Sequence, residues 1–241
     1  MGRRGLSPAA VGRKALALRA AQPAETSPES KPEQAGSGRV ERIGILGGTF
    51  DPPHLGHLWL ATLAADELGL SRVLLMPAAR PPHKGGRVVS NVADRVTMTR
   101  LAITGDPILD LSLVEMERPG PSYTVDSLVQ LRNKLGRGVG LVLVMAGDSL
   151  ADVGTWRQPE RLLELAEWAV APRTGAPFPD RAALKERFGA GAARIHLLGG
   201  PTLDVSSSEI RRRVAGGRSI RYLVPRSVEE FIVDRRLYRR G

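Results

Sequence analysis

The chain has 241 residues, 42% of them apolar, which is enough material for one sizeable α/β core. It contains no cysteine, which excludes disulfides, thiolate metal sites and cysteine nucleophiles and fits a cytoplasmic protein. The formal net charge is +10, but the excess lies in residues 1–42 and 204–241 while the middle of the chain is close to neutral, so we expect no dedicated nucleic-acid partner.

The first part of the chain, residues 1–40, has the composition of a flexible extension. It ends in the tract "AQPAETSPESKPEQAGSG", which holds almost no large apolar residue and cannot bury enough surface to stay ordered. Basic residues interrupt its only apolar part, which argues against a secretory signal. No apolar run in the chain approaches the ~20 residues of a membrane-spanning helix. We therefore expect a disordered extension over residues 1–40, one catalytic domain over residues 41–241, and no membrane association.

From residue 42 onward, short apolar runs alternate with segments of helical spacing. The runs predict buried strands at residues 42–46, 72–77, 109–116, 140–147, 167–173 and 194–199. The segments between them predict helices at residues 57–70, 92–103, 124–136, 159–167 and 181–189, three of them closed by a glycine. This alternation is typical of a doubly wound, mainly parallel sheet with helices on both faces, in which ligands bind beyond the carboxyl ends of the strands.

The stretch "GILGGTFDPPHLGHL", residues 44–58, follows the first predicted strand, where such a site is expected. Gly47 and Gly48 allow backbone amides to approach an anion closely, and the start of the next helix adds the positive end of its dipole. The spacing matches neither a dinucleotide fingerprint nor a P-loop. The stretch nevertheless predicts a phosphate-binding turn.

Two histidines, His54 and His57, lie three residues apart in this stretch, so a helical first turn places both rings on one face, with Gly56 leaving room between them. Three interpretations compete. The rings are polar capping or core groups, or they bind zinc together with Asp51, or they donate hydrogen bonds to nucleotide phosphates. The chain has only two other histidines and no cysteine to complete a zinc site, so we expect no protein-bound metal.

A second anion site favours the phosphate interpretation. In "VSSSEIRRRV", residues 205–214, Ser206 and Glu209 form a capping-box pattern, so the amides of Ser207 and Ser208 should face outward from a helix N-terminus. Arg211 follows one turn later, where a guanidinium can close on a bound phosphate. Alone, the segment could equally be a capped, solvated helix. Together with the first site it predicts a ligand with several phosphates.

At this point the motifs resemble a known superfamily. "GGTFDPPHLGHL" matches the G-x-F-x-P-x-H-x-G-H signature of the HIGH-type nucleotidylyltransferases, and "VSSSEIR" resembles their I-S-S-T-x-I-R signature. The blocks "MPAARPPHK", "RPGPSYTVDSL", "GDSLADVGTW" and "YLVPRSVEEFIVDRRLY" are similar to those of the bacterial nicotinate-nucleotide adenylyltransferase family, so the resemblance spans residues 42–239. It implies the Rossmann-like nucleotidylyltransferase fold.

The resemblance also implies a reaction in NAD biosynthesis. The 5′-phosphate of nicotinate mononucleotide attacks the α-phosphorus of ATP and gives deamido-NAD and pyrophosphate, without a covalent intermediate. Mg²⁺ would arrive on the ATP phosphates. An adenylyltransferase for another acceptor, such as nicotinamide mononucleotide or FMN, remains the main alternative, and a basic nucleic-acid-binding module is a second. A homo-oligomer is compatible with the sequence.

The resemblance assigns roles on the ATP side. Thr49 and Phe50 would present amides to the phosphates, and His54 and His57 would bracket the α-phosphate, with His57 as the main transition-state contact. The remaining ATP ligands would be Ser207, Ser208 and Arg211 for the β- and γ-phosphates and Asp148 for the ribose. In "MAGDSL", Ala146 and Gly147 reverse the family's usual order, which puts the local loop geometry at Asp148 in question.

On the acceptor side, the resemblance assigns Trp156 to stacking on the pyridine ring and Thr124 to reading its carboxylate. Lys84 resembles a phosphate-binding lysine, and Gly48 would also contact this substrate. Thr124 has a structural interpretation as well, as the N-cap of the next helix. The other tryptophans, Trp59 and Trp168, lie inside apolar segments and are expected in the core.

Overall fold

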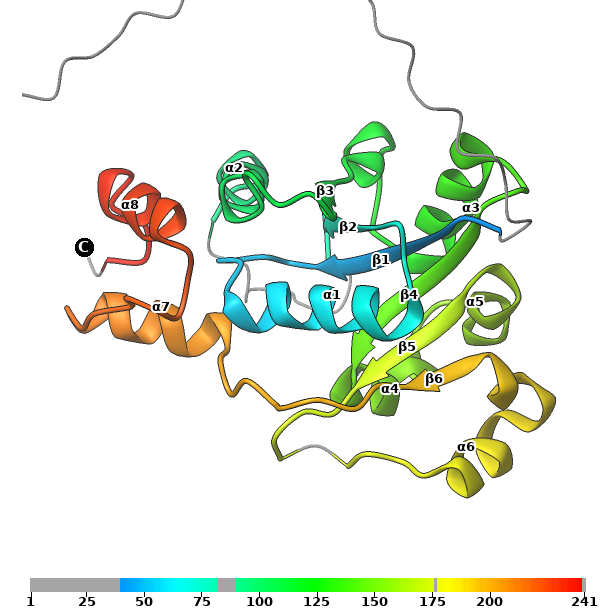
Figure 1. The fold of residues 1–241 in the computed structure, drawn as a ribbon. Coiled ribbons are helices and arrows are strands. Elements are labelled where there is room, and N and C mark those ends of the chain that lie inside the picture. Colours follow the sequence, from blue (N-terminus) through cyan, green and yellow to red (C-terminus); the bar gives the residue numbers. More distant parts are fainter. Residues whose placement is uncertain (1–39, 82–89, 176, 240–241) are drawn as a thin grey trace, which may run out of the picture. The chain divides into compact units, whose positions relative to one another are not determined.

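A parallel β-sheet runs through the part of the chain that the computed structural model describes, residues 40–81, 90–175 and 177–239 (Figure 1). The strand order is β3-β2-β1-β4-β5-β6, and every pairing is parallel. This is the order of a doubly wound Rossmann-type sheet, so the expected fold class is confirmed. The strands are β1 (Arg42–Gly48), β2 (Arg72–Pro77), β3 (Leu109–Leu111), β4 (Gly140–Ala146), β5 (Glu167–Ala171) and β6 (Ile195–Leu197).

The inner strands are apolar on both faces because helices cover both. Along β4, Leu141 and Leu143 belong to one buried cluster, whereas Val142 and Val144 belong to another. A strand covered on both sides needs no polar alternation, which explains the continuous apolar runs in the sequence.

Helix α1 (Leu55–Leu68) packs on one face of the sheet and lies alongside β1 in Figure 1. The other face is covered by α3 (Thr124–Leu135), α5 (Pro159–Leu165) and α6 (Arg181–Phe188). Within the described ranges, no helix combines the length and the apolar character that crossing a membrane would require.

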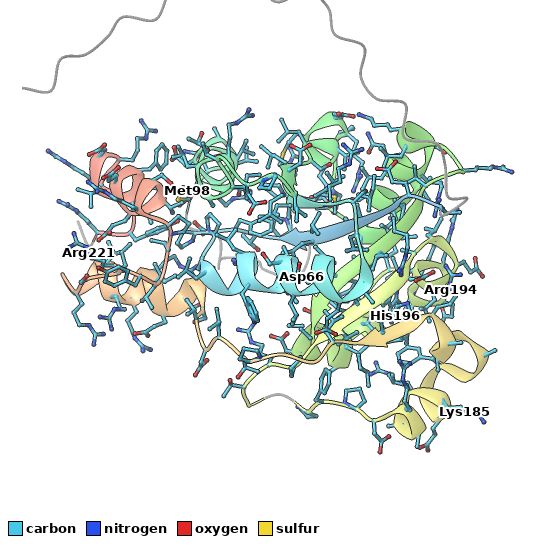
Figure 2. All side chains as sticks on the ribbon, viewed as in Figure 1. Asp66, Met98, Lys185, Arg194, His196 and Arg221 are labelled. Atoms are coloured by element: carbon cyan, nitrogen blue, oxygen red, sulfur yellow. The ribbon has the colours of Figure 1, made fainter. Side chains whose placement is uncertain are left out.

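A third buried cluster joins α2 (Val92–Ala102), α7 (Ser207–Ala215) and α8 (Arg226–Asp234). Met98 of α2 is fully buried in it (Figure 2). The short elements are α4 (Gly147–Asp152) and the 3-10 turns η1 (Val114–Glu117), η2 (Val153–Thr155) and η3 (Gly189–Arg194).

The helix ends follow the local signals. Gly69, Gly136 and Gly189 directly follow α1, α3 and α6, as expected, and Gly69 adopts the left-handed conformation with φ 60°. Asn91 caps α2 by accepting a hydrogen bond from the Asp94 N–H at 2.8 Å.

Two expectations differ from the structure or fall outside it. The strand predicted for residues 109–116 stops at Leu111, because the chain then turns through η1, which buries Val114 in the core and Glu115 beside the site described below. The extension predicted for residues 1–40 lies outside the described residues except for Val40, so its boundary stays a prediction.

Candidate active site

A cavity of about 390 Å³ opens at the carboxyl ends of β1 and β4. These neighbouring strands mark the point where the strand order reverses, since β1 leads to β2 on one side and β4 leads to β5 on the other. The cavity brings together almost all the residues predicted for the site: Gly48, Thr49, Phe50, His54, His57, Thr124, Asp148, Trp156, Ser207, Ser208 and Arg211. Lys84 lies outside the described residues.

The β1–α1 turn, residues 49–53, forms one wall. Gly47 and Gly48 are the last two residues of β1, and the residue of the turn with a left-handed conformation is Phe50, whose φ is 50°. A Cβ on Gly48 would come within 3.0 Å of the Phe50 ring, so glycine makes room for that buried ring. The buried guanidinium of Arg95 donates to the Thr49 carbonyl at 2.9 Å. The same Arg95 nitrogen donates to the Ala78 carbonyl at 2.7 Å, so it joins this turn to the residue after β2.

The two histidines meet at the start of α1, and the centroids of their rings lie 3.7 Å apart in a stacked arrangement. The His54 N–H donates to Nδ1 of His57 at 3.2 Å, so a neutral His57 ring carries its proton on Nε2. Burial lowers the pKa of His54 to about 3, and the positive charge of Arg173 adds to the shift. A neutral His54 ring can stack this closely on its neighbour without charge repulsion.

The histidine rings have both a capping contact and a place in the cavity wall. His54 is the N-cap residue of α1, and the His57 ring caps the helix by accepting a hydrogen bond from the His54 N–H, while both rings also line the cavity. A Cβ on Gly56 would lie 3.1 Å from the His54 ring, which explains the glycine between them. Across residues 40–81, 90–175 and 177–239, no group of three His, Asp or Glu side chains is arranged to hold a metal ion.

The second predicted anion site joins the first directly. Ser206 caps α7, as expected, by accepting a hydrogen bond from the Glu209 N–H at 3.2 Å. The Ser207 hydroxyl donates to the Pro52 carbonyl at 2.8 Å, and Nη1 of Arg211 donates to the Asp51 carbonyl at 2.7 Å. The N-terminus of α7 is therefore hydrogen-bonded to the β1–α1 turn across more than 150 residues of sequence.

Asp148 lies in the first turn of α4 and forms an ion pair with Arg173 at 3.2 Å. The preceding Gly147 is tightly packed, since a Cβ there would lie 3.3 Å from the Pro177 carbonyl. This contact gives the reversed Ala-Gly order a physical reason. Sequence reasoning missed Arg173, although it follows β5 at the sheet edge where ligands are expected.

The opposite wall of the cavity includes Thr124 and Trp156. Thr124 is the first residue of α3, and Tyr123, not Thr124, occupies the N-cap position. Trp156 is partly buried against the core and also lines the cavity, while its stacking on a pyridine ring stays a prediction. Trp168 is fully buried, as expected, but Trp59 is only partly buried and donates to the Pro201 carbonyl at 2.7 Å.

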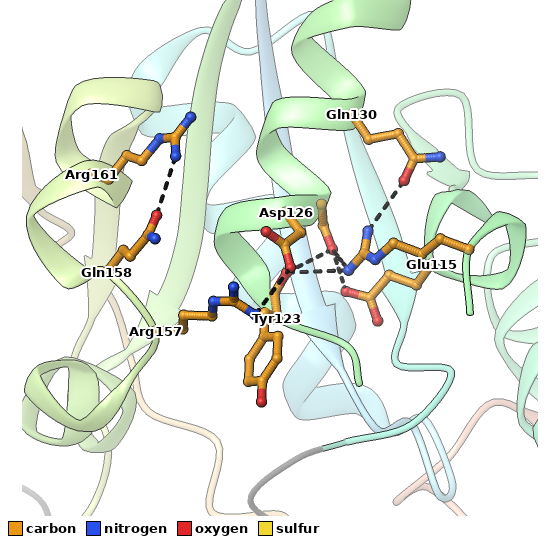
Figure 3. Close-up of polar contacts among 9 residues, drawn as sticks. Glu115, Tyr123, Asp126, Gln130, Arg157, Gln158 and Arg161 are labelled. Atoms are coloured by element: carbon orange, nitrogen blue, oxygen red, sulfur yellow. Dashed lines mark hydrogen bonds and ion pairs between the residues drawn. The ribbon is translucent and has the colours of Figure 1, made fainter. Parts of the chain in front are cut away.

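A buried polar network supports this wall (Figure 3). Arg118 donates to the Ser127 hydroxyl at 2.8 Å and to the Tyr123 carbonyl at 3.2 Å, and the Ser127 hydroxyl donates to Glu115 at 2.6 Å. The guanidinium of Arg157, the residue after Trp156, lies 4.8 Å from the centre of the Tyr123 ring. The network ties η1 and the Trp156 loop to the first turn of α3. Glu115, which also lines the cavity, gave no sequence signal because it lay in a predicted strand.

Known proteins are similar to this chain in sequence and in fold. Residues 45–213 match the cytidylyltransferase-like family. A probable nicotinate-nucleotide adenylyltransferase of Thermomicrobium roseum is 48% identical over 200 residues, which cover 83% of this chain and 92% of that protein. A protein of the same description from Thermus thermophilus is 44% identical over 198 residues, covering 82% of this chain and all of the relative.

Solved structures show the shared fold at lower identity. The nicotinic acid mononucleotide adenylyltransferase of Plasmodium falciparum, complexed with NaAD, superposes with a TM-score of 0.69 at 18% identity and covers 82% of this chain and 97% of that one. The family match includes both predicted anion sites, and the relatives align with 82–83% of the chain. The chain therefore belongs to the cytidylyltransferase-like family and, within it, to the nicotinate-nucleotide adenylyltransferases.

Proposed function

We propose that this protein transfers the adenylyl group of ATP to nicotinate mononucleotide, giving nicotinate adenine dinucleotide (deamido-NAD) and pyrophosphate. The observation that carries the proposal is the single cavity that joins a two-part anion site to a wall bearing an aromatic ring. The names of the relatives support it, as do the structures of the Plasmodium falciparum enzyme with NaAD and with APC.

In the proposed step, a 5′-phosphate oxygen of the mononucleotide attacks the α-phosphorus of ATP. The bond from that phosphorus to the β-phosphate oxygen breaks, and pyrophosphate leaves with the bonding electrons. The protein forms no covalent bond in this step. Its contribution is to hold two phosphates in line and to stabilise the charge that develops between them.

His57 is the main proposed contact to the α-phosphate, with Nε2–H as the donor. The hydrogen bond from the His54 N–H to Nδ1 supports this role because it leaves the proton on the other nitrogen. His54, held neutral by its burial, would support the His57 ring by stacking and bracket the same phosphate.

The rest of ATP would bind along the joined anion sites. The amides of Thr49 and Phe50 would contact the phosphates from the β1–α1 turn, while Ser207, Ser208 and Arg211 would hold the β- and γ-phosphates at the α7 N-terminus. We propose that Mg²⁺ enters bound to the ATP phosphates and offsets the charge of the departing pyrophosphate. Asp148 would accept hydrogen bonds from the ribose after parting from Arg173.

Nicotinate mononucleotide would bind at the opposite wall. The pyridine ring would stack on Trp156, and the pyridine carboxylate would lie near Thr124, where the N-terminal end of α3 favours a negative charge. Gly48 would contact this substrate, and a phosphate contact from Lys84 stays a prediction from the sequence.

An assay with four acceptors tests the proposal. Pyrophosphate release from ATP and Mg²⁺ would be measured with nicotinate mononucleotide, nicotinamide mononucleotide, FMN and phosphopantetheine in separate reactions. We expect release with nicotinate mononucleotide to exceed release with the other three. Release with neither pyridine mononucleotide would refute the proposed activity, and faster release with the amide would correct the acceptor.

A further inference from the structure

The segment that follows α8 reaches the back of the β1–α1 turn. The hydroxyl of Tyr238, close to the C-terminal end of the chain, donates to Oδ1 of Asp51 at 2.8 Å. Both residues are buried, with exposed fractions of 9% and 1%. Tyr238 belongs to the block "YLVPRSVEEFIVDRRLY", to which the proposed reaction assigns no role.

Asp51 connects the two anion sites. Its carboxylate also accepts a hydrogen bond from the Ser90 N–H at 3.4 Å, while its carbonyl accepts the one from Arg211. The next carbonyl, that of Pro52, accepts from Ser207. The backbone of the turn is therefore held by α7, and the Asp51 carboxylate accepts hydrogen bonds from both the Ser90 N–H and the Tyr238 hydroxyl of the C-terminal segment.

The backbone that delivers the phenol is strained. Arg236 and Tyr238 adopt left-handed conformations, with φ values of 52° and 62°, that L side chains with a Cβ rarely occupy. Such conformations persist only where the surroundings specify them, and they concentrate at functional sites. Here the Tyr238 ring packs in the cluster formed by α2, α7 and α8, and the Leu237 N–H donates to the Ile232 carbonyl at 3.0 Å.

The phenol serves as a hydrogen-bond donor over the whole working pH range, because burial raises the pKa of Tyr238 far above its ordinary value. Tyr238 does not line the cavity, so it has no direct contact with a bound ligand. The hydrogen bond to Asp51 links its hydroxyl to the cavity, because Asp51 does line it.

We propose that Tyr238 is a positioning residue for the triphosphate of ATP. Its hydroxyl, acting through Asp51, holds the β1–α1 turn at the separation from α7 at which both can contact one triphosphate. The inference rests on the proposed function for the identity of this ligand. The residues proposed for the acceptor lie on α3 and the Trp156 loop, so loss of the Tyr238 hydroxyl should leave acceptor binding unchanged.

The test removes the hydroxyl alone. Tyr238→Phe keeps the buried ring, and Tyr222→Phe is the matched control, because Tyr222 lies in the same part of the chain with 83% of its surface exposed. MgATP binding to each full-length protein is measured by titration calorimetry, and steady-state kinetics are measured with both substrates. We expect Tyr238→Phe to weaken MgATP binding about tenfold and to lower kcat, since small displacements of a positioned group cost this much. The KM for nicotinate mononucleotide should stay within twofold.

Three outcomes would overturn the inference. The first is MgATP binding by Tyr238→Phe within twofold of the wild type. The second is an equal loss for both substrates, and the third is an equal loss in the Tyr222→Phe control. A wild-type protein that binds MgATP but adenylylates neither pyridine mononucleotide would refute the proposed function and still leave the Tyr238 comparison readable.

A double-mutant cycle gives a second, independent check. Asp51→Ala removes the acceptor of the Tyr238 hydrogen bond, so Tyr238→Phe should weaken MgATP binding little further in that background. Circular dichroism and thermal unfolding of each variant show whether the fold is intact. Additive losses in folded variants would mean that Tyr238 does not act through Asp51.

Discussion

The charge state of the histidine pair follows from contacts inside the protein. His57 Nδ1 is an acceptor for the His54 N–H, and the pKa of His54 is far below the working range. The His54 ring is therefore neutral and the His57 ring offers Nδ1 as an acceptor, while Arg211 and Arg173 are the cationic side chains among the described residues that line the cavity. A neutral donor can strengthen its hydrogen bond as negative charge develops on a phosphate without binding the ground state excessively.

Replacing His57 with Ala should therefore impair turnover more than substrate binding. We expect kcat to fall roughly 100-fold, as it does when one positioned donor to a transition state is lost. His196→Ala is the matched control. His196 lies on β6, contacts Glu167 of β5 and is not among the residues that line the cavity. Steady-state kinetics measure kcat and KM for each variant, and circular dichroism shows whether each variant is folded. Activity of His57→Ala within about threefold of the wild type, a change worth less than ~1 kcal/mol, would remove the assigned role.

The buried His54 should make stability depend on pH. Its pKa is about 3 in the folded protein and 6.5 when exposed, so between these values the unfolded chain binds the additional proton. The free energy of unfolding should therefore fall as pH falls below 6.5, by roughly 1.4 kcal/mol per pH unit from this group.

His54→Asn keeps a good N-cap residue and removes the titrating ring. Urea unfolding between pH 4.5 and 7.5 should show a shallower pH dependence for this variant than for the wild type. Parallel curves for the two proteins would mean that His54 is protonated in the folded state.

Trp156→Ala should act on the acceptor. Loss of a stacking ring costs about 1–3 kcal/mol per base, so we expect the KM for nicotinate mononucleotide to rise at least about tenfold. The KM for MgATP should change little, because the predicted anion sites lie on the β1–α1 turn with the start of α1 and on the N-terminus of α7. Trp156→Phe retains an aromatic face, so its KM for nicotinate mononucleotide should lie between those of the wild type and Trp156→Ala in steady-state assays. An unchanged acceptor KM in Trp156→Ala would return the residue to a purely structural role.

At the scale of elements, the sequence predicted the strands and helices that are long enough to show a regular pattern of apolar residues. The strands of the sheet interior were found because burial on both faces produces uninterrupted apolar runs, and α1, α3 and α6 were found because helical spacing ends at a glycine. Short elements escaped, among them α4, η1 and η2. A six-residue helix or a 3-10 turn spans too few residues to show a period, and its conformation depends on tertiary contacts.

The network between η1 and α3 is one of these tertiary contacts, and Ser127 is its central link. Ser127→Ala leaves Glu115 and Arg118 without their shared partner in a fully buried position. We expect the free energy of unfolding in urea to fall by about 1–3 kcal/mol. The KM for the acceptor should rise while MgATP binding stays unchanged, because the network supports the Thr124 wall.

Ser71→Ala is the control for this change, since the Ser71 hydroxyl makes exposed hydrogen bonds in the loop between α1 and β2. It should change the free energy of unfolding, the acceptor KM and MgATP binding only slightly. Weakened MgATP binding in Ser127→Ala would show that the two halves of the cavity are not independent.

At the scale of the whole molecule, the site depends on strand order. The sequence placed two anion motifs about 150 residues apart, but the alternation of strands and helices permits several orders. The observed order sets β1 beside β4 and so brings the turn after β1, the first residues of α4 and the N-terminus of α7 to one cavity. Arg173 and the Asp51–Tyr238 contact escaped sequence reasoning for this reason, since each depends on which distant segments become neighbours.

The same view of the molecule predicts that residues 1–39 are dispensable. The family match begins at residue 45, and the relatives align with 82–83% of this chain while covering 92–100% of their own length. Residues 1–39 carry seven of the 35 basic residues and three of the 25 acidic ones, so their removal also lowers the net positive charge.

A chain that starts at Val40 after an initiating methionine should keep kcat and both KM values within about twofold, and its Tm should stay within about 2 °C of the full chain, a difference below ~1 kcal/mol. The dependence of kcat/KM on salt concentration should also be measured for both proteins. If the extension attracted the anionic substrates electrostatically, the full chain alone would lose kcat/KM steeply as ionic strength rises, because charges beyond about 10 Å are screened at 0.1 M salt. Equal salt dependence in both proteins would place the whole of substrate attraction in the cavity, whereas a steeper dependence in the full chain would give the extension a function in substrate capture.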